Sequence, residues 1–474
     1  MESFSVIVVE IILAVSAATI LLLTLFASQA EQKKLPRFTL AILGSLFLGI
    51  PFLWNLNGML FENAFRLDHF ALFFKMLFIG AGFCVVDMSR SFETLQKRAG
   101  EFNLLMILAI LGACTLASSR NLAVMFVSIE LMTITLYILT GYFKSNKESI
   151  EAASKYLVMG AFSSGIMLYG ISLIYGVSGS FSLDAIRLSL SMFPAVPKMF
   201  HAGFLLFLAG LGFKISLFPF QLWVPDVYEG APTPITAFLS VVSKSAGFAI
   251  LVRILNVVDK TQTLWVPLFV LLSAATILYG NLGALPQING NLKRLLGYSS
   301  IANAGYLLMG IASHSALGLR AMFYYLIVYA IANLVIFFGI SLSQIENESV
   351  SNFKGLFTAS PVIAISMFIA LLSLAGIPPL GGFVGKFFLF QAIIESGALW
   401  LALLGAINIV ISLYYYLRIV KIIYVDTSSL TSQKPIYLPA GAKLIVIGLA
   451  SSLIILGIFQ APLFHITLQT LQIH

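Results

Sequence analysis

Apolar segments of about 20 residues, each long enough to cross a bilayer as a helix, follow one another along the whole chain. Short polar stretches separate these segments and leave no room for a soluble domain. The pattern therefore predicts an all-α polytopic membrane protein of about fourteen transmembrane helices, in a single membrane domain over residues 1–474. The expected segments are 4–27, 39–59, 68–88, 102–119, 121–143, 150–176, 200–220, 235–256, 263–284, 299–313, 319–343, 361–394 with an interruption, 400–424 and 441–460.

Glycine and proline break the apolar pattern in two regions, residues 209–247 and 361–394. The prolines are Pro219, Pro225, Pro232 and Pro234 in the first region, and Pro378 and Pro379 in the second. Lipid cannot satisfy the backbone groups that such breaks release, so discontinuous helices are expected to line a protein cavity. The stretches G-F-K-I-S-L-F (Gly212–Phe218) and V-G-K-F-F-L-F (Val384–Phe390) adjoin the breaks and suggest an internal repeat.

Charged side chains within apolar segments are the candidate functional residues. A charge at the bilayer centre costs roughly 2.5–3.5 kcal/mol on insertion scales and usually faces the interior of the bundle. Lys214 and Lys386 fall at the broken segments, and Lys244 shares a helical face with Ser240 and Gly247. The complete set of candidates is Glu130, Lys155, Lys214, Lys244 and Lys386.

Each candidate also has a structural interpretation. Glu130 can be a protonated, silent carboxyl, and Lys244 can reach toward an interface. Lys155 lies one turn into its segment, where a lysine can extend its ammonium group to the membrane surface. Glu10 and Lys75 are expected to be interface residues rather than site residues.

Buried lysines can transfer protons near neutral pH. In general, burial lowers the pKa of a lysine, and a nearby carboxylate raises it again. A buried lysine whose acidic partner approaches and retreats is therefore a switchable proton site. Glu130 with Lys214, followed by Lys244 and Lys386, supplies the groups for such a site.

Composition supports a membrane protein and excludes other classes. The chain is 59% hydrophobic and 10% charged, whereas a soluble domain carries about 25% charged residues. The net charge of +8 is spread over short loops, so nucleic-acid binding is not expected. If both termini lie on the outer face, most loop lysines and arginines lie inside, as the positive-inside tendency requires. The outer loops then hold only Arg66, Arg120, Arg187, Lys198, Arg253, Lys260 and Arg320.

The sequence predicts no cofactor or metal site in this chain. It has no G-x-G-x-x-G motif, and the run G-G-F-V-G-K-F fails the phosphate-loop spacing. Cys84 and Cys114 lie in apolar segments and are expected to pack as small hydrophobic residues. The five histidines are not clustered.

Three longer motifs resemble the antiporter-like membrane subunits of respiratory complex I, the proton-translocating NADH:quinone oxidoreductase. They are F-P-F-Q-L-W-V-P-D-V-Y-E-G-A-P-T-P, N-L-K-R-L-L-G-Y-S-S-I-A-N-A-G-Y-L-L and L-A-G-I-P-P-L-G-G-F-V-G-K-F. The resemblance covers nearly the whole chain. It implies two inverted five-helix repeats, here 102–256 and 263–424, each containing one discontinuous helix.

The resemblance also implies roles for particular residues. The family's glutamate falls on Glu130, its lysines on Lys155, Lys214 and Lys244, and its terminal lysine on Lys386, where related subunits often carry glutamate. Two positions depart from the pattern, because many relatives have histidine where this chain has Gln221 and Asn303. A proton route that needs imidazole at those points would have to use hydroxyl groups and water instead.

The implied function is proton movement coupled to electron transfer in partner subunits, which would hold NADH, FMN, iron–sulfur clusters and quinone. The implied partners are the other membrane and peripheral subunits and the lipid of a bacterial inner membrane. The nearest alternative is a subunit of a Mrp-type cation/proton antiporter, which has no redox partner. A structural spacer is a further alternative, although a spacer gains nothing from buried charges that together cost on the order of 10 kcal/mol.

Overall fold

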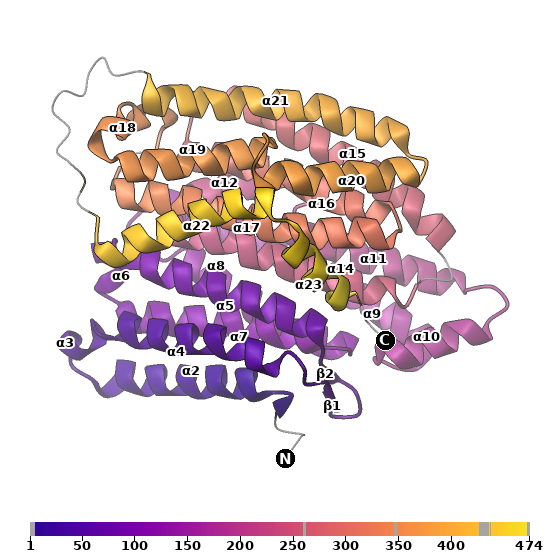
Figure 1. Cartoon of the computed structure of the whole chain (residues 1–474). Helices are drawn as coiled ribbons and strands as arrows, with labels where there is room; N and C mark the ends of the chain where they lie inside the picture. Colours follow the sequence, from indigo (N-terminus) through magenta and orange to yellow (C-terminus); the bar gives the residue numbers. More distant parts are fainter. Residues whose placement is uncertain (1–4, 259–261, 346–347, 426–435, 437, 472–474) are drawn as a thin grey trace. The chain divides into compact units, whose positions relative to one another are not determined.

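The computed structural model describes residues 5–258, 262–345, 348–425, 436 and 438–471, and most of these residues are helical (Figure 1). Within this part, 12 helices are long and apolar enough to cross a membrane, and each matches a segment predicted from the sequence. They are α2 (Val8–Phe26), α4 (Leu35–Gly49) with its extension η1 (Ile50–Leu53), α5 (His69–Ser89), α7 (Ala99–Ser118), α8 (Leu122–Thr140), α9 (Lys147–Ser178), α13 (Thr233–Phe238) joined to α14 (Lys244–Leu255), α15 (Gln262–Ala284), α16 (Leu292–Ala312), α17 (Ala316–Ser343), α21 (Leu399–Tyr424) and α22 (Ala440–Ile458).

The two remaining predicted segments are the discontinuous ones. α11 (Lys198–Lys214) and α12 (Trp223–Gly230) are separated by a non-helical stretch. α19 (Pro361–Ala375) and α20 (Gly381–Glu395) are separated in the same way, and both lie in the orange part of the ribbon in Figure 1. The predicted all-helical polytopic fold is therefore confirmed, with 12 candidate spans among the described residues and two discontinuous segments beside them.

The residues between α19 and α20 explain the break. Gly376 follows α19 with a φ of 84°, a left-handed conformation that side chains disfavour. Pro378 and Pro379 cannot donate backbone hydrogen bonds, so the helix cannot continue through them. The start of α20 then passes so close to α19 that a Cβ on Gly382 would collide with the carbonyl oxygen of Ser373. Only glycine fits at that contact.

The short sequence repeat does not mark equivalent positions in the two broken helices. Lys214 is the last residue of α11, before the first break. Lys386 lies in α20, after the second break. The match between the two K-x-x-L-F stretches is therefore coincidental, because one lysine lies before its break and the other lies after its break.

The helix that carries Lys244 is irregular. Leu239–Ser243 forms a π-helical segment between α13 and α14, and Lys244 is the first residue after it. A π turn is rare, and it often marks a functional site because it leaves the regular i→i−4 hydrogen-bond pattern.

The sequence pattern missed a small β-hairpin. β1 (Gly58–Leu60) pairs antiparallel with β2 (Phe65–Leu67) around a turn with positive φ at Phe61, Glu62 and Asn63. Strands of three residues are too short for an alternating pattern to be recognised. The shorter helical elements are α3 (Gln29–Gln32), α6 (Glu93–Gln96), α10 (Leu183–Met192), η4 (Leu285–Gln287), η5 (Val350–Phe353), α18 (Leu356–Ala359) and α23 (Ala461–Thr470).

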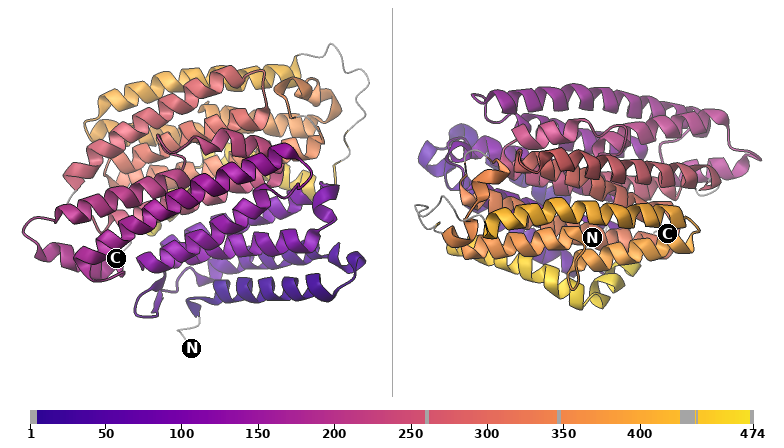
Figure 2. Two further views of the ribbon diagram at one scale, coloured as in Figure 1. Left: turned by 180° about the vertical axis from the view of Figure 1, so that it is seen from behind. Right: turned by 90° about the horizontal axis from the view of Figure 1, so that it is seen from above.

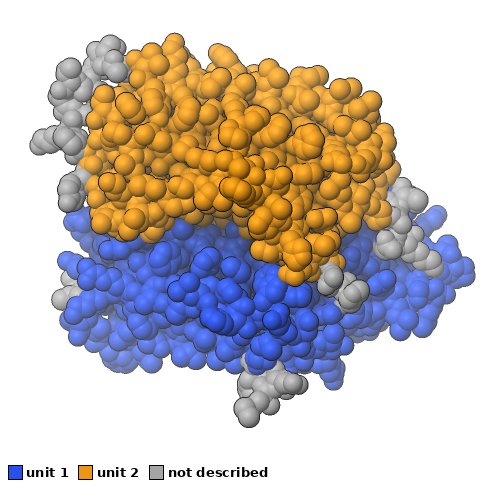
Figure 3. Space-filling view, viewed as in Figure 1, with its two compact units in different colours: residues 1–215, 242–265, 472–474 blue, residues 216–241, 266–471 orange. Residues whose placement is uncertain are grey.

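Contacts divide the chain into two compact units (Figure 3). Unit 1 comprises residues 1–215, 242–265 and 472–474, and unit 2 comprises 216–241 and 266–471. In unit 1, α9 packs along α11, as Figure 2 shows, and α7 packs against α2, α5 and α8. In unit 2, the largely buried α17 packs against α13, α16, α19, α20 and α22 and forms the centre of the core.

Arg253 is a buried residue of α14 and not a loop residue. Only 2% of it is exposed, and its Nη1 and Nη2 atoms lie 2.8 and 3.0 Å from the two carboxylate oxygens of Asp68. Nη2 also donates to the carbonyl oxygen of Ala117 over 2.8 Å. The assignment of Arg253 to an outer loop is therefore wrong, and this residue gives no topological signal.

Asp68 is the N-cap of α5 and accepts a hydrogen bond from the Ala71 N–H over 2.8 Å. Burial by itself raises the pKa of the Asp68 carboxyl. The Arg253 guanidinium and the Ala71 N–H outweigh that effect and hold this pKa below its usual range. The Asp68–Arg253 pair therefore links α14, α5 and α7 through charged hydrogen bonds that burial protects from water.

Candidate functional site

Glu130 and Lys214 come together in unit 1, as the sequence predicts. The Nζ atom of Lys214 lies 3.7 Å from Oε1 of Glu130. Ser164 of α9 connects them: its hydroxyl donates to Oε1 of Glu130 over 2.6 Å and accepts from Nζ of Lys214 over 3.3 Å. A serine hydroxyl can exchange donor and acceptor roles, so this arrangement allows a proton to pass between the ammonium and the carboxylate.

The surroundings of Lys214 exclude water from its ammonium group and also stabilise the positive charge. Its side chain is completely buried, whereas 21% of the Glu130 side chain is exposed. The rings of Tyr137 and Phe213 lie 6.0 and 5.6 Å from Nζ and present aromatic faces to the cation. Lys214 also ends α11, where the partial negative charge of a helix C-terminus favours a cation.

Lys244 lies on the neighbouring α14 and is 1% exposed. α11 and α14 are in contact, and Gly247 packs directly against Ile215, the residue that follows Lys214. The structure therefore places Lys214 and Lys244 on adjoining helices, both at points where regular α-helix is interrupted.

Lys386 is held at the second break, in unit 2. Its Nζ donates to the carbonyl oxygen of Leu374, in the last turn of α19, over 2.6 Å. The rings of Tyr306 and Tyr325 lie 4.7 and 5.9 Å from Nζ. A helix terminus and two aromatic faces therefore take the place of a carboxylate in stabilising the ammonium form.

Lys155 differs from the other candidates. Its side chain is 43% exposed, and its Nζ pairs with Oε1 of Glu151 on the same helix over 2.7 Å. The structure therefore brings together Glu130 and Lys214, places Lys244 on the adjoining helix, and leaves Lys155 on the surface of α9.

Glu10 and Lys75 are a buried ion pair, and the expectation that they are interface residues is wrong. Oε1 of Glu10 lies 2.8 Å from Nζ of Lys75 and accepts a hydrogen bond from Ser118 over 3.2 Å. Their side chains are 8% and 0% exposed. The pair links α2, α5 and α7, and the signal that could have found it is that Glu10 is the one charged residue of its apolar segment and Lys75 is the one lysine or arginine of the other.

The two positions where histidine was expected differ in their surroundings. Gln221 is buried, and its Oε1 has no hydrogen-bond partner among the described residues. Asn303 is fully engaged: its Nδ2 donates to the Ser299 carbonyl oxygen over 2.9 Å, and its Oδ1 accepts from the Tyr325 hydroxyl.

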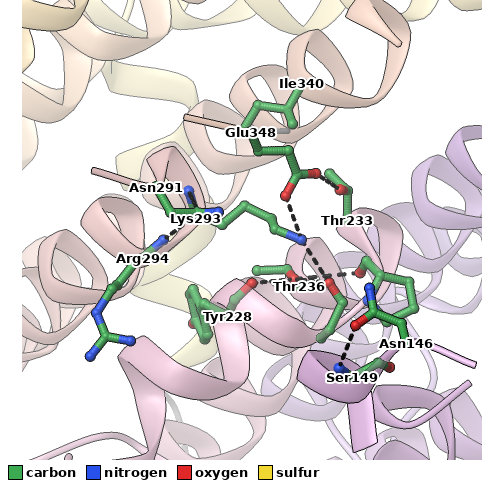
Figure 4. Close-up of polar contacts among 12 residues, drawn as sticks. Asn146, Ser149, Tyr228, Thr233, Thr236, Asn291, Lys293, Arg294, Ile340 and Glu348 are labelled. Atoms are coloured by element: carbon green, nitrogen blue, oxygen red, sulfur yellow. Dashed lines mark hydrogen bonds and ion pairs between the residues drawn. The ribbon is translucent and has the colours of Figure 1, made fainter. Parts of the chain in front are cut away.

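A second charged cluster lies at the start of α16 in unit 2 (Figure 4). Lys293 donates to the carbonyl oxygen of Ala231 over 2.8 Å and pairs with Oε2 of Glu348 over 2.7 Å. Thr233 donates to the other carboxylate oxygen of Glu348. Lys293 is only 4% exposed, so it ties α13 to α16 rather than marking a free loop. No group of three metal-ligating side chains occurs among the residues that the structure describes.

Comparison with known proteins identifies the family. The family model described as "NADH:quinone oxidoreductase/Mrp antiporter, TM" matches residues 119–412. The NADH-quinone oxidoreductase subunit N of Moorella thermoacetica is 39% identical over 467 residues, covering 98% of this chain and 97% of the relative. That of Desulfitobacterium hafniense is also 39% identical, over 97% of this chain and 96% of the relative.

Solved structures agree with this assignment. A chain of respiratory complex I from Thermus thermophilus is 30% identical with a TM-score of 0.83, covering 96% of this chain and 98% of that chain. A chain of the Mrp complex from Dietzia sp. has a TM-score of 0.82 at 20% identity, covering 98% of this chain and 96% of that chain, and shares the fold. This chain therefore belongs to the family of antiporter-like membrane subunits of NADH:quinone oxidoreductase, and within it to the subunit N group.

Proposed function

We propose that this chain is the proton-translocating subunit N of an NADH:quinone oxidoreductase. Partner subunits would bind NADH, FMN, iron–sulfur clusters and quinone and would carry out electron transfer, while this chain moves protons. The single observation that carries the proposal is the buried Glu130–Lys214 pair, bridged by Ser164 beside a broken helix.

The pair supplies a switch with two states. When Glu130 is close, its negative charge holds the proton on Lys214. When the two separate, the buried ammonium loses that stabilisation, and the proton passes to Lys244 and then to Lys386. The non-helical stretch after Lys214 supplies local freedom for this motion. The two repeats, 102–256 and 263–424, would each contribute one broken helix, and Lys155 would exchange protons with the membrane surface.

Deletion of this chain separates the proposal from the Mrp alternative. We expect membranes that lack it to lose proton transport driven by NADH oxidation and quinone reduction, and the chain supplied from a plasmid should restore it. The measurement is acidification of inverted vesicles after NADH addition. Retained NADH-driven transport together with lost sodium resistance would instead identify a Mrp-type antiporter.

The termini are proposed to lie on the outer face of the membrane, from the excess of basic residues in the inner loops. A topology reporter fused after His474 should then report the outer face, and one placed between Val425 and Leu438 the inner face. Residues 426–435 and His474 lie outside the described residues. Reversed labelling at both positions would overturn the orientation, and the same label at both would overturn the number of spans.

A further inference from the structure

A row of buried hydroxyl groups crosses the core of unit 2. The Tyr228 hydroxyl of α12 lies 3.1 Å from the Ser300 hydroxyl of α16, which lies 2.8 Å from the Tyr329 hydroxyl of α17. All three residues are at most 1% exposed. In both hydrogen bonds either oxygen can be the donor, so the row can be ordered in either direction.

One end of the row lies in a short helix that also carries side chains within reach of solvent. Tyr228 is in the same short helix as Asp226 and Glu229, whose carboxylates both lie 2.7 Å from Nη1 of Arg294. The side chains of these three charged residues are 29–31% exposed, so water reaches them. Water can therefore bring protons to α12, the helix that carries the Tyr228 end of the row.

The other end of the row leads toward Lys386. Tyr325 precedes Tyr329 by four residues on α17, so the two side chains lie on the same helical face. The Tyr325 ring is one of the two rings that face the Lys386 ammonium group. The hydroxyl row therefore runs from a partly exposed charged cluster toward the lysine at the second broken helix.

A neighbouring row of polar groups ends at an amide. The Tyr416 hydroxyl bonds to the Ser299 hydroxyl, and Nδ2 of Asn303 lies 3.4 Å from that serine oxygen. The other end of the Asn303 amide accepts from the Tyr325 hydroxyl. An amide nitrogen only donates and an amide oxygen only accepts, so Asn303 orders its neighbours but cannot pass a proton on.

We propose that the hydroxyls of Tyr228, Ser300 and Tyr329 form a second proton input to Lys386. Protons would enter this row at the end near Asp226, Glu229 and Arg294. Asn303 would block proton transfer along the neighbouring row of Tyr416 and Ser299. This inference rests on the proposed function and extends it with a route that bypasses Glu130 and Lys214. Each transfer conserves protons. A hydronium ion from the solvent gives a proton to the Tyr228 oxygen and becomes water, as Tyr228 passes its own proton to Ser300 and Ser300 passes one to Tyr329. Tyr329 then passes one through intervening water to neutral Lys386, which becomes the ammonium form.

Tyr329→Phe tests the row because it removes one hydroxyl and keeps the ring. Tyr324→Phe is the matched control: Tyr324 is also fully buried on α17, but its hydroxyl donates to the carbonyl oxygen of Leu456, outside the row. Protons transported per NADH oxidised are measured in vesicles and normalised to assembled complex. We expect Tyr329→Phe to fall to about half, since one of two inputs is closed, and Tyr324→Phe to stay at the wild-type value.

A second variant separates proton transfer from a structural role. Replacing Asn303 by His in the Tyr329→Phe background puts an imidazole, which can both accept and donate a proton, into the closed row. We expect this double variant to recover most of the lost transport, whereas a packing defect at Tyr329 would not be repaired from another helix. Glu130→Gln, measured alongside, tests the proposed function independently.

The outcomes distinguish the two ideas. Equal transport in wild type and Tyr329→Phe, with Glu130→Gln impaired, would overturn the hydroxyl input and leave the proposed function standing. Equal losses in Tyr329→Phe and Tyr324→Phe, or no recovery with Asn303→His, would show that these hydroxyls serve packing alone. Normal transport in all the variants, Glu130→Gln included, would overturn the proposed function as well.

Discussion

Replacing Glu130 by Gln is expected to lower proton transport per NADH oxidised to about half, with the complex still assembled, because the input through Lys214 falls by about tenfold or more while the hydroxyl row still loads Lys386. The change keeps the size and polarity of the side chain but leaves the fully buried Lys214 ammonium without its carboxylate. Removing one partner of a buried ion pair costs roughly 3–5 kcal/mol, and about 1.4 kcal/mol already corresponds to a factor of ten. The protonated form of Lys214 would then be too rarely populated to sustain proton transfer through this lysine.

Two further variants sharpen this test. Glu130→Asp keeps the carboxylate on a shorter side chain and should retain part of the transport. Glu93→Gln is the control, because that glutamate pairs with Lys97 on the exposed surface, where the two side chains are 85% and 68% exposed. An exposed pair contributes about 0–1 kcal/mol, so Glu93→Gln should behave as wild type. Wild-type coupling in Glu130→Gln would show that Glu130 is a structural carboxyl.

Replacing Arg253 by Met is expected to reduce the amount and thermal stability of the assembled protein strongly. The change removes both hydrogen bonds that the Arg253 guanidinium donates to the buried Asp68 carboxylate and leaves only Arg66, whose Nε lies 3.8 Å from Oδ2, at a cost of about 3–5 kcal/mol. Whole domains are stable by only about 5–15 kcal/mol, so this is a large fraction. The measurement is the thermal unfolding midpoint of the purified complex, together with its yield. Lys97→Met, which removes an exposed partner, should leave both unchanged.

A double variant and the pH dependence identify the cause. Arg253→Met combined with Asp68→Leu leaves no buried charge and should recover most of the stability. Because the pKa of Asp68 is depressed in the folded protein, the pair stabilises the wild type above the unfolded-state pKa of an aspartate. That contribution is lost as the pH falls through the folded-state pKa. Failure of the double variant to recover would assign the effect to the packing of Arg253 on Phe70, whose ring lies 4.3 Å from the guanidinium carbon.

The positions of the helices could be predicted from the sequence because a bilayer imposes both length and composition on each of them. Every described span matches a predicted apolar segment, and the breaks fall where proline and glycine forbid regular helix. The β-hairpin was missed because three-residue strands carry no recognisable pattern. The K-x-x-L-F repeat gave a wrong indication of equivalent positions, because Lys214 lies before the first break and Lys386 lies after the second.

The site was only partly predictable, since an ion pair joins residues far apart in the chain. Glu130 and Lys214 were recognised as partners because Glu130 stands deep in an apolar segment and Lys214 stands beside a break. Glu10 and Lys75 stand in equally apolar segments, but nothing local shows that α2 and α5 bring them within 2.8 Å. Ser164 could not be identified either, because a serine in an apolar helix is common and only the fold places it between two charges.

The ion pair Glu10–Lys75 also affects how unit 1 responds to a membrane potential. A voltage does work only on net charge, about 2.3 kcal/mol per elementary charge for each 100 mV. Glu10 and Lys75 are opposite charges 2.8 Å apart that sum to zero, so the field exerts no net force on the helices that they connect. A proton that moves from one lysine to the next has no such counter-charge. The electric field of an energised membrane therefore acts on the transported proton, while it exerts no net force on the Glu10–Lys75 pair.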